Sequence, residues 1–219
     1  MPELIDTYRH KGLRKKLIET IKQKGITDER VLAAMANIPR HFFMDNALDN
    51  IAYEDRAFPI EAGQTISQPY TVAYQTQLLE LKSTDSVLEI GTGSAYQASV
   101  LAEIGVDVFT IERQQKLFDK NKDSFVRKIY PNIQFYFGDG FLGWPEYAPF
   151  DKILVTAAAP YIPVPLLQQL KPGGFLVIPV DEGDSQRMMR ITKHTDGTTT
   201  EEYFEKFKFV PMLGNENSK

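Results

Sequence analysis

The stretch Val87-Leu-Glu-Ile-Gly-Thr-Gly-Ser-Ala-Tyr96 decides the fold of this 219-residue chain. Its first four residues are typical of a buried strand, and the two glycines predict a tight turn in which the backbone comes close to a ligand. The apolar-rich run from Ala98 to Ile104 predicts a helix, and Val106 to Ile111 predicts a second strand that ends on Glu112. Open α/β sheets bind nucleosides with this order of elements, because the final acid can accept hydrogen bonds from two ribose hydroxyls.

The composition is that of an ordinary globular protein, with 42% hydrophobic and 25% charged residues and a net charge of −4. This charge gives no general attraction to nucleic acid or to an anionic membrane. The chain has no cysteine, which excludes disulfides, thiolate metal sites and cysteine nucleophiles, and we predict no metal site. No apolar run reaches the roughly 20 residues that span a bilayer, and the N-terminus lacks the pattern of a secretory signal. We expect a cytoplasmic monomer.

Two helices are predicted before the substrate-facing part of the chain. Residues 3 to 23 place Leu13, Leu17, Ile18 and Ile21 on one helical face. The basic residues around that face are predicted to be solvated rather than to bind RNA: Arg9, Lys11, Arg14, Lys15 and Lys16. The second helix is capped by Thr27 or Asp28 and ends before Pro39.

Residues 54 to 70 show no clear period and carry the polar run Gln64-Thr-Ile-Ser-Gln68 before Pro69. A loop rich in hydroxyls and amides, placed before the nucleotide-binding strand, is a candidate substrate loop. The alternative is a linker in which Ser67 or Gln68 starts a helix from Tyr70 to Leu81, with Pro69 in its first turn. The two interpretations are compatible, and the residues alone do not separate them.

The alternation of helices and strands continues to residue 180. A helix is predicted over 114–128 and a short one over 166–170, and strands over 133–137, 150–155 and 175–180. This order implies a parallel sheet with helices on both faces. Residues 187–193 and 201–210 are predicted to be two antiparallel strands joined by a turn at Asp196-Gly197. We expect a single domain over 1–219, with an N-terminal helical extension and substrate loop (1–70), a cofactor-binding core (71–180) and C-terminal strands (181–219).

The glycine turn does not fit a dinucleotide. Position 96 of such a turn is normally small, and here it is Tyr96. The chain also lacks the Gly-Lys-Ser/Thr triplet of a phosphate-binding loop. A single nucleoside with a small charged group, such as S-adenosylmethionine, would suffice, with Glu112 on its ribose. Asp139, between two glycines at the end of the third strand, could accept a hydrogen bond from the adenine amine.

Each of these features also has an ordinary structural explanation as a turn, a cap or a strand end. Their arrival in order, at the carboxyl ends of three successive strands, favours a nucleoside site.

Several segments together resemble the protein-L-isoaspartate O-methyltransferases over nearly the whole chain. The segments are Gln64-Thr-Ile-Ser-Gln-Pro69, Val87-Leu-Glu-Ile-Gly-Thr-Gly-Ser94, Gly138-Asp-Gly140, Phe150-Asp-Lys-Ile-Leu-Val-Thr-Ala-Ala-Ala-Pro160, Lys171-Pro-Gly-Gly174 and Phe207-Lys-Phe-Val-Pro-Met-Leu-Gly214. The glycine turn is shared by many methyltransferases, whereas Thr65-Ile-Ser-Gln-Pro69 is far more specific. The fold implied is α/β: a Rossmann-like class I methyltransferase with a mostly parallel, doubly wound sheet, an antiparallel C-terminal hairpin and an N-terminal helical extension.

The resemblance implies a function and a set of site residues. The family uses S-adenosylmethionine to esterify the free carboxylate of L-isoaspartyl residues, and less well of D-aspartyl residues, in damaged proteins and peptides. The methyl ester then collapses to a succinimide that partly reopens to aspartate. The active-site serine of the family maps to Ser67. Its cofactor residues map to Gly91, Thr92, Gly93, Ser94, Glu112, Asp139 and Gly140. Its substrate surface maps to Thr65, Ile66, Ser67, Gln68, Thr156, Ala157, Val210 and Pro211.

The chain departs from the family pattern at three places. Glu61-Ala62 stands where glycine and histidine or glutamine are usual, and a carboxylate there could repel an anionic substrate. Ala95 replaces a usual glycine, which is tolerable in helical geometry but costs affinity where φ is positive. Gln75 stands where methionine is common.

The chemistry itself asks little of the protein. A carboxylate is already ionised near pH 7, so no general base is required, and the protein must align oxygen, methyl and sulfur and exclude water. Ser67 is therefore predicted to donate an orienting hydrogen bond rather than to act as a nucleophile. The three histidines, His10, His41 and His194, are predicted to be packing or surface residues.

Two other classes of function are open to the sequence. The first is a methyltransferase of the same fold that acts on RNA or on a small molecule. The second is a non-catalytic adenosyl-binding protein.

Overall fold

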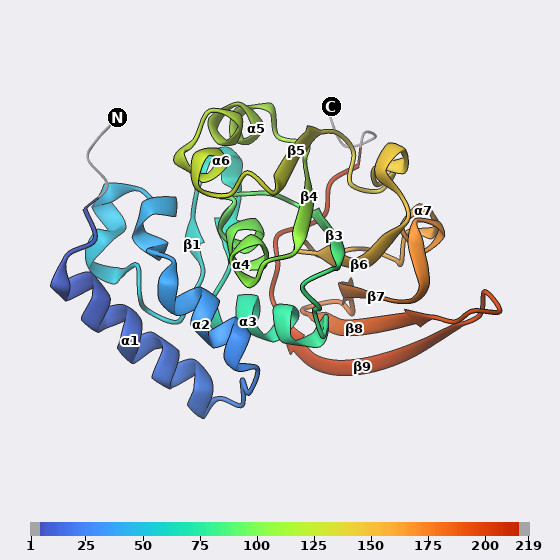
Figure 1. Ribbon diagram of the computed structural model, residues 1–219, viewed down its shortest axis with the longest axis horizontal. Helices are drawn as coiled ribbons and strands as arrows, with labels where there is room; N and C mark the ends of the chain where they lie inside the picture. Colours follow the sequence, from blue (N-terminus) through green and yellow to red (C-terminus); the bar gives the residue numbers. More distant parts are fainter. Residues whose placement is uncertain (1–4, 215–219) are drawn as a thin grey trace.

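A seven-stranded sheet forms the centre of the protein (Figure 1), for which the computed structural model describes residues 5–214. Its strand order is β5-β4-β3-β6-β7-β8-β9. Five neighbouring strands are parallel, and β8 and β9 add an antiparallel hairpin at one edge. The strands are β3 (Ser86–Ile90), β4 (Asp107–Glu112), β5 (Ile133–Phe137), β6 (Phe150–Val155), β7 (Leu170–Asp181), β8 (Gln186–Lys193) and β9 (Thr199–Phe207). A separate antiparallel pair joins β1 (Phe58–Pro59) to β2 (Thr65–Ile66).

Two hydrophobic clusters cover the two faces of the sheet. Val87 belongs to one cluster, whereas the next residue, Leu88, belongs to the other. This alternation follows from strand geometry, in which successive side chains point to opposite faces. The helices are α1 (Tyr8–Gln23), α2 (Glu29–Asn37), α3 (Pro69–Leu78), α4 (Tyr96–Ile104), α5 (Gln115–Lys122), α6 (Phe125–Ile129) and α7 (Val164–Gln168), with 3-10 turns η1 (Arg40–Phe43), η2 (Asn46–Ile51), η3 (Glu61–Gly63) and η4 (Pro145–Tyr147). The doubly wound architecture expected from the sequence is confirmed.

Several predicted boundaries were wrong for identifiable reasons. Within the described chain α1 begins at Tyr8, because Thr7 caps it, and residues 3 and 4 of the prediction lie outside the described range. The single helix predicted over 114–128 is two helices, α5 and α6. β7 begins at Leu170, because a register shift against β6 lets residues 171–174 bulge within the strand. The last strand ends at Phe207 rather than at residue 210.

Arg14 corrects the prediction of a solvated basic face on the first helix. The buried residues of α1 are His10, Arg14, Leu17 and Ile21, which follow the helical spacing of one face. The guanidinium of Arg14 pairs with both carboxylate oxygens of Asp6, at 3.1 and 2.9 Å. It also donates to the carbonyl oxygen of Ala36 at 2.6 Å. An arginine can therefore occupy the apolar face when each donor finds a partner.

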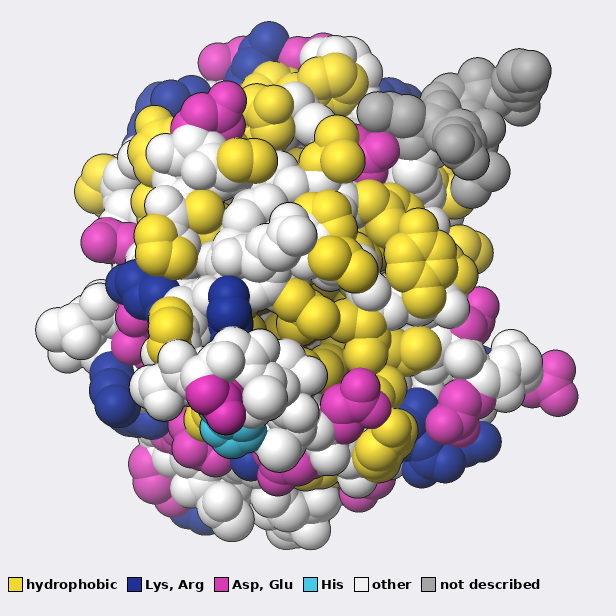
Figure 2. Space-filling model, turned by 90° about the vertical axis from the view of Figure 1, so that its right-hand side faces the viewer, with side chains coloured by type: hydrophobic (Ala, Val, Ile, Leu, Met, Phe, Trp, Pro, Cys, Tyr) yellow, Lys and Arg dark blue, Asp and Glu magenta, His cyan; other side chains and the backbone are white. Residues whose placement is uncertain are grey.

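Figure 2 shows a face on which hydrophobic side chains gather across the middle. The basic side chains visible on it are scattered among acidic and hydrophobic ones, so this face has no continuous basic area of the kind that RNA binding favours. Within residues 5–214, no helix is both long and apolar enough to cross a bilayer.

Ala62→Gly is expected to stabilise the protein. Ala62 is exposed and has a φ of 57° in η3, and this left-handed conformation costs alanine about 1 kcal/mol more than glycine. The substitution should raise the free energy of unfolding by roughly 0.5–1 kcal/mol in urea titrations. Ala33→Gly is the matched control, since Ala33 is exposed in the middle of α2. This substitution should lower the free energy of unfolding by about 1 kcal/mol, because glycine is a poor helix former. A loss of stability at both positions would contradict the strain at Ala62.

Candidate functional site

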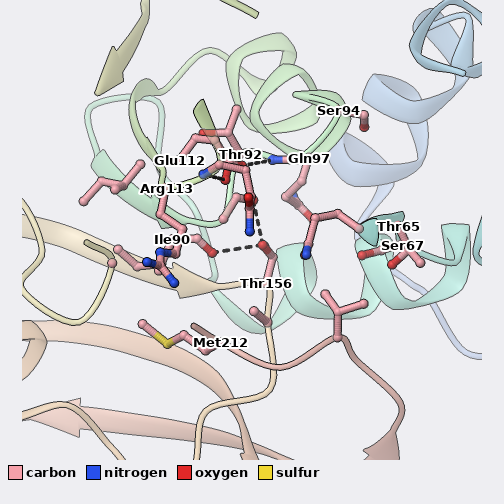
Figure 3. Close-up of a pocket in the computed structure, with 18 of the residues that line it drawn as sticks. Thr65, Ser67, Ile90, Thr92, Ser94, Gln97, Glu112, Arg113, Thr156 and Met212 are labelled. Atoms are coloured by element: carbon pink, nitrogen blue, oxygen red, sulfur yellow. Dashed lines mark hydrogen bonds between the residues drawn. The ribbon is translucent and has the colours of Figure 1, made fainter. Parts of the chain in front are cut away.

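The glycine turn lies where the carboxyl ends of β3, β4 and β6 meet (Figure 3). The backbone amides of Gly91 and Thr92 both donate to the carbonyl oxygen of Ile111, at 2.9 and 3.1 Å. Gly91 has a φ of 98°, and a Cβ added there would lie 2.7 Å from the Thr156 hydroxyl oxygen. Glycine is required at this position both by its conformation and by the close approach of β6.

Thr156 joins the end of β6 to the same turn. Its backbone N–H donates to the carbonyl oxygen of Ile90 at 3.0 Å. Its hydroxyl lies within hydrogen-bond distance of two carbonyl oxygens, that of Ile90 at 2.9 Å and that of Gly91 at 2.8 Å. The turn is thus held from both sides. Its amide groups bond to β4, and its carbonyl groups bond to the residue that follows β6.

Glu112 lies beside the turn at the end of β4. Its two carboxylate oxygens accept from the backbone N–H of Gly93 at 2.9 Å and of Gln114 at 2.7 Å. Burial raises the pKa of Glu112, and these backbone donors oppose that shift. Each carboxylate oxygen has two lone pairs. The group can therefore still accept hydrogen bonds from two ribose hydroxyls, as the sequence predicted.

A buried acid that sequence reasoning did not assign lies beneath the turn. Glu89 is fully buried, and one of its oxygens accepts from the Thr110 hydroxyl at 2.5 Å. The Thr110 hydroxyl is in turn 2.7 Å from that of Thr92. Burial raises the pKa of Glu89 to about 8, so its carboxyl group is mostly protonated at pH 7. The available signal was an acid inside an otherwise apolar strand.

The substrate loop forms the wall of the cavity that faces Glu112. Figure 3 shows Thr65 and Ser67 on one side, Glu112 and Arg113 on the other, and Thr156 between them. Thr65 and Ile66 are held by the pairing of β2 with β1. Gln68 is the N-cap residue of α3, with Pro69 in its first turn, which confirms the predicted helix start, while the role of the loop in substrate binding stays a prediction. The carbonyl oxygen of Ser67 accepts from Arg40, a residue that sequence reasoning passed over.

Most of the predicted site residues line one cavity. They are Thr65, Ile66, Ser67, Gly91, Thr92, Gly93, Ser94, Glu112, Gly140, Thr156, Ala157, Val210 and Pro211. Residues that line it without having been predicted include Gln64, Ile90, Tyr96, Gln97, Arg113, Gln114, Met212 and Leu213. Several of these residues have apolar side chains, so their types do not indicate a ligand-binding site in the sequence.

Three predicted residues differ from the rest. The side chain of Gln68 is bonded to Asp55 at 3.2 Å, and Gln68 lines an adjoining groove that shares Thr65, Ser67, Thr156 and Val210 with the cavity. The Ser94 hydroxyl accepts from the N–H of Tyr96, and Figure 3 shows it apart from the other side chains. Asp139 is not among the residues that line the cavity, and its carboxylate accepts from the N–H of Phe141 at 2.9 Å.

The C-terminal segment reaches the site through backbone pairing. The N–H of Ala158 donates to the carbonyl oxygen of Val210 at 2.8 Å, and the N–H of Met212 donates to that of Ala158 at 2.7 Å. These bonds hold Val210 and Pro211 against the residues that follow β6. Two segments far apart in sequence therefore meet at the cavity.

The three departures from the family pattern have structural consequences. Glu61 forms ion pairs with Lys116 at 3.1 Å and Lys120 at 2.9 Å, which compensate the charge expected to repel substrate. Ala95 caps α4 with a φ of 65°, so it is in the strained alternative and not in helical geometry. Gln75 donates to the carbonyl oxygen of Val155, just before Thr156, at 2.9 Å.

Two of the three histidines are buried against each other, with ring centroids 3.9 Å apart. His10 contacts Asp49 at 3.0 Å, and His41 contacts the Tyr53 hydroxyl at 2.8 Å and the carbonyl oxygen of Ile5 at 3.2 Å. Burial lowers the pKa of His41. The side-chain atoms of His10, His41 and Asp6 lie close enough for a metal, but both imidazoles already hydrogen-bond through each ring nitrogen. These contacts indicate packing residues.

Glu89→Gln is expected to change how stability depends on pH. The folded-state pKa of about 8 lies above the ordinary 4.5, so the folded protein keeps a proton that the unfolded chain releases between these values. The stability from this group is complete below pH 4.5 and is lost as the pH rises from 4.5 through 8, at about 1.4 kcal/mol per pH unit between these values. Glutamine stays neutral, so in urea unfolding the variant should nearly match the wild type at pH 5.

At pH 9 the Glu89→Gln variant should be the more stable protein by roughly 3–5 kcal/mol. Glu19→Gln, on the exposed side of α1, is the control and should leave the pH profile unchanged. An equal difference at pH 5 and pH 9 would show that Glu89 does not bind a proton on folding.

Comparison with known proteins agrees with this geometry. Residues 12–217 match the family described as Protein-L-isoaspartate(D-aspartate) O-methyltransferase (PCMT). The protein-L-isoaspartate O-methyltransferase of Cytophaga hutchinsonii is 54% identical over 211 residues, which cover 96% of this chain and 95% of that protein. A solved protein-L-isoaspartate O-methyltransferase is 30% identical with a TM-score of 0.82, and the match covers 92% of this chain and 66% of that one.

A second solved structure is that of a protein-L-isoaspartate O-methyltransferase from Plasmodium falciparum in complex with S-adenosyl-L-homocysteine. It is 25% identical with a TM-score of 0.80, and the match covers 92% of this chain and 99% of that one. The family match and the relatives span nearly all of the sequence, and the chain belongs to the protein-L-isoaspartate(D-aspartate) O-methyltransferase family.

Proposed function

We propose that this protein uses S-adenosylmethionine to methylate the free carboxylate of L-isoaspartyl residues, and of D-aspartyl residues, in damaged proteins and peptides, and so starts their repair. One observation carries the proposal. The Thr65-Ile-Ser67 segment, which is specific to this family, faces the glycine turn across a single cavity, with Thr156 between them. The family membership and the relative crystallised with S-adenosyl-L-homocysteine support the same cofactor.

The residues around the turn fit an adenosyl group. A Cβ at Gly140 would overlap the Ile90 side chain, and one at Gly91 would meet the Thr156 hydroxyl, so both positions need glycine for the strand ends to pack this closely around the cavity. Glu112 would accept from the ribose hydroxyls, and Gly91, Thr92, Gly93 and Ser94 line the part of the cavity that the rest of the ligand would occupy. Asp139, next to Gly140, is proposed to accept from the adenine amine.

The protein's part in the reaction is to orient the substrate and exclude water. S-adenosylmethionine, when bound, supplies an electrophilic methyl group. The Ser67 hydroxyl would donate a hydrogen bond to one oxygen of the substrate carboxylate and so aim the other oxygen at that methyl. Ile66 and Val210 line the same cavity with apolar side chains, which lowers the cost of bringing an anion to a cation. No side chain needs to remove a proton, because the carboxylate is already ionised.

The wider setting forms part of the proposal. We infer a cytoplasmic monomer that acts on isoaspartyl proteins and peptides, not on nucleic acid or at a membrane. Residues 1–70 would position substrate, residues 71–180 would bind the cofactor, and residues 181–219 would complete the substrate surface of a single domain. Formation of a methyl ester on an isoaspartyl peptide tests the activity. Methylation of another acceptor with none on that peptide would contradict it.

Ser67→Ala is expected to lower kcat/KM for an isoaspartyl peptide by roughly tenfold to a hundredfold, because a hydrogen bond to a charged group is lost. The dissociation constant of S-adenosyl-L-homocysteine, measured by calorimetry, should change less than threefold or so. Ser83→Ala, at an exposed position, is the matched control for both measurements. An equal loss of cofactor affinity in the Ser67 variant would contradict its assignment to the substrate.

Asp139→Ala is expected to have the reverse effect. Loss of the acceptor for the adenine amine should weaken binding of S-adenosyl-L-homocysteine by about tenfold or more, while turnover at saturating cofactor changes little. An unchanged cofactor affinity would contradict the assignment of Asp139 to the adenine amine.

A further inference from the structure

A fully buried arginine lies directly behind the substrate loop. Arg40 has no exposed surface and is the largest of the completely buried side chains in the described chain. Its guanidinium donates to the carbonyl oxygen of Ser67 at 2.9 Å and to that of Ala52 at 3.1 Å. The guanidinium carbon also lies 5.0 Å from the ring centre of Tyr96, at the start of α4. Arg40 therefore connects the substrate loop to the glycine-turn region through the interior.

No carboxylate within residues 5–214 forms a hydrogen bond or an ion pair with Arg40. The neighbouring side chain that most opposes the effect of burial on its pKa is that of Tyr96, and Nη1 makes no hydrogen bond of normal geometry in this part of the chain. Asp55 acts on it only at a distance, and the Asp55 carboxylate is already paired with Lys24 at 2.6 Å. Burial lowers the pKa of Arg40 to about 10, which still leaves the group charged at pH 7.

A buried cation without a paired anion is costly, and the cost is not explained by the two carbonyl groups that it bonds. A neutral amide could donate to both carbonyl oxygens without bringing a charge into the interior. The charge becomes useful when an anion enters the cavity next to Ser67. Arg113 is the other arginine of this site, and Figure 3 shows it on the opposite wall beside Glu112.

We propose that Arg40 is a positioning residue for the substrate. It holds the peptide group of Ser67 in place, and its positive charge compensates the carboxylate of the isoaspartyl residue that Ser67 orients. The inference rests on the proposed function, because it takes the anion at Ser67 to be the isoaspartyl carboxylate. Because the guanidinium acts through the loop and across a short distance, it raises affinity for the anion without touching the reacting atoms.

The effect of the charge of Arg40 on substrate binding can be separated from the effect of its packing by titrating two peptides into two variants. One peptide carries isoaspartate and the other carries the neutral isoasparagine amide, each titrated calorimetrically into the complex with S-adenosyl-L-homocysteine. Arg40→Lys keeps a cation, whereas Arg40→Gln keeps a donor without charge. For the isoaspartyl peptide, the lysine variant should remain within about fivefold of wild type, and the glutamine variant should weaken by roughly tenfold to a hundredfold. The amide peptide should not distinguish the two variants.

The proposal is overturned if both variants weaken both peptides equally, since that is the result of a purely structural role. It is also overturned if neither variant changes the preference for the charged peptide. Binding of S-adenosyl-L-homocysteine within about threefold of wild type shows that each variant is folded and that its cofactor site is intact.

Should Arg40→Gln fail to fold, Ser67→Ala tests the same idea with Arg40 present. Without the serine hydroxyl, a preference of about tenfold for the isoaspartyl over the amide peptide should remain, because the buried charge is still there. Equal affinities would refute the role of Arg40. Wild-type protein that forms no ester on the isoaspartyl peptide would instead refute the proposed function.

Discussion

The peptide groups of the glycine turn are satisfied by two neighbouring strands, and the rest of the site depends on this constraint. The carbonyl oxygen of Ile111 in β4 accepts from both amides of the turn, while Thr156 after β6 donates to its carbonyl groups. Buried backbone groups need partners, so the turn can take this shape only where three parallel strands end together. Gly91 is required because any side chain would collide with the Thr156 hydroxyl. The position of the glycine and the shape of the turn thus depend on one set of hydrogen bonds between the ends of β3, β4 and β6.

Glu89 beneath the turn and Arg40 behind the substrate loop are both fully buried, and burial shifts their pKa values in opposite directions. Glu89 has a pKa raised to about 8 and is mostly neutral at pH 7, whereas Arg40 has a pKa lowered to about 10 and remains charged. The same desolvation acts on both, but the ordinary pKa of arginine is far enough above neutrality to survive it. The buried charge near Ser67 is therefore positive, which suits an anionic substrate.

The core of the fold could be predicted because each element has a local signal. The apolar strands around residues 87–90, 106–111 and 150–155 are short and bounded by turn residues, and Asp28 and Pro69 act at helix starts as their residue types suggest. The errors arose where tertiary contacts decide. From its residue type Arg14 was predicted to be solvated, but it is buried because Asp6 and the carbonyl group of Ala36 accept its hydrogen bonds. The strand through residues 171–174 depends on the pairing of β7 with β6, which the local sequence does not indicate.

The same distinction explains the site. Residues whose chemistry shows in their type, such as Glu112 and Ser67, could be predicted from their place in a motif to line the cavity that the structure shows. Arg40 could not, because its importance comes from a contact with the backbone 27 positions away and from the absence of a paired carboxylate in the described chain. The residues proposed for the cofactor lie at the ends of three neighbouring strands, whereas those proposed for the substrate come from β2, the start of α3, the residues after β6 and the C-terminal segment. A function assembled from separate segments becomes visible only when the sheet brings them to one edge.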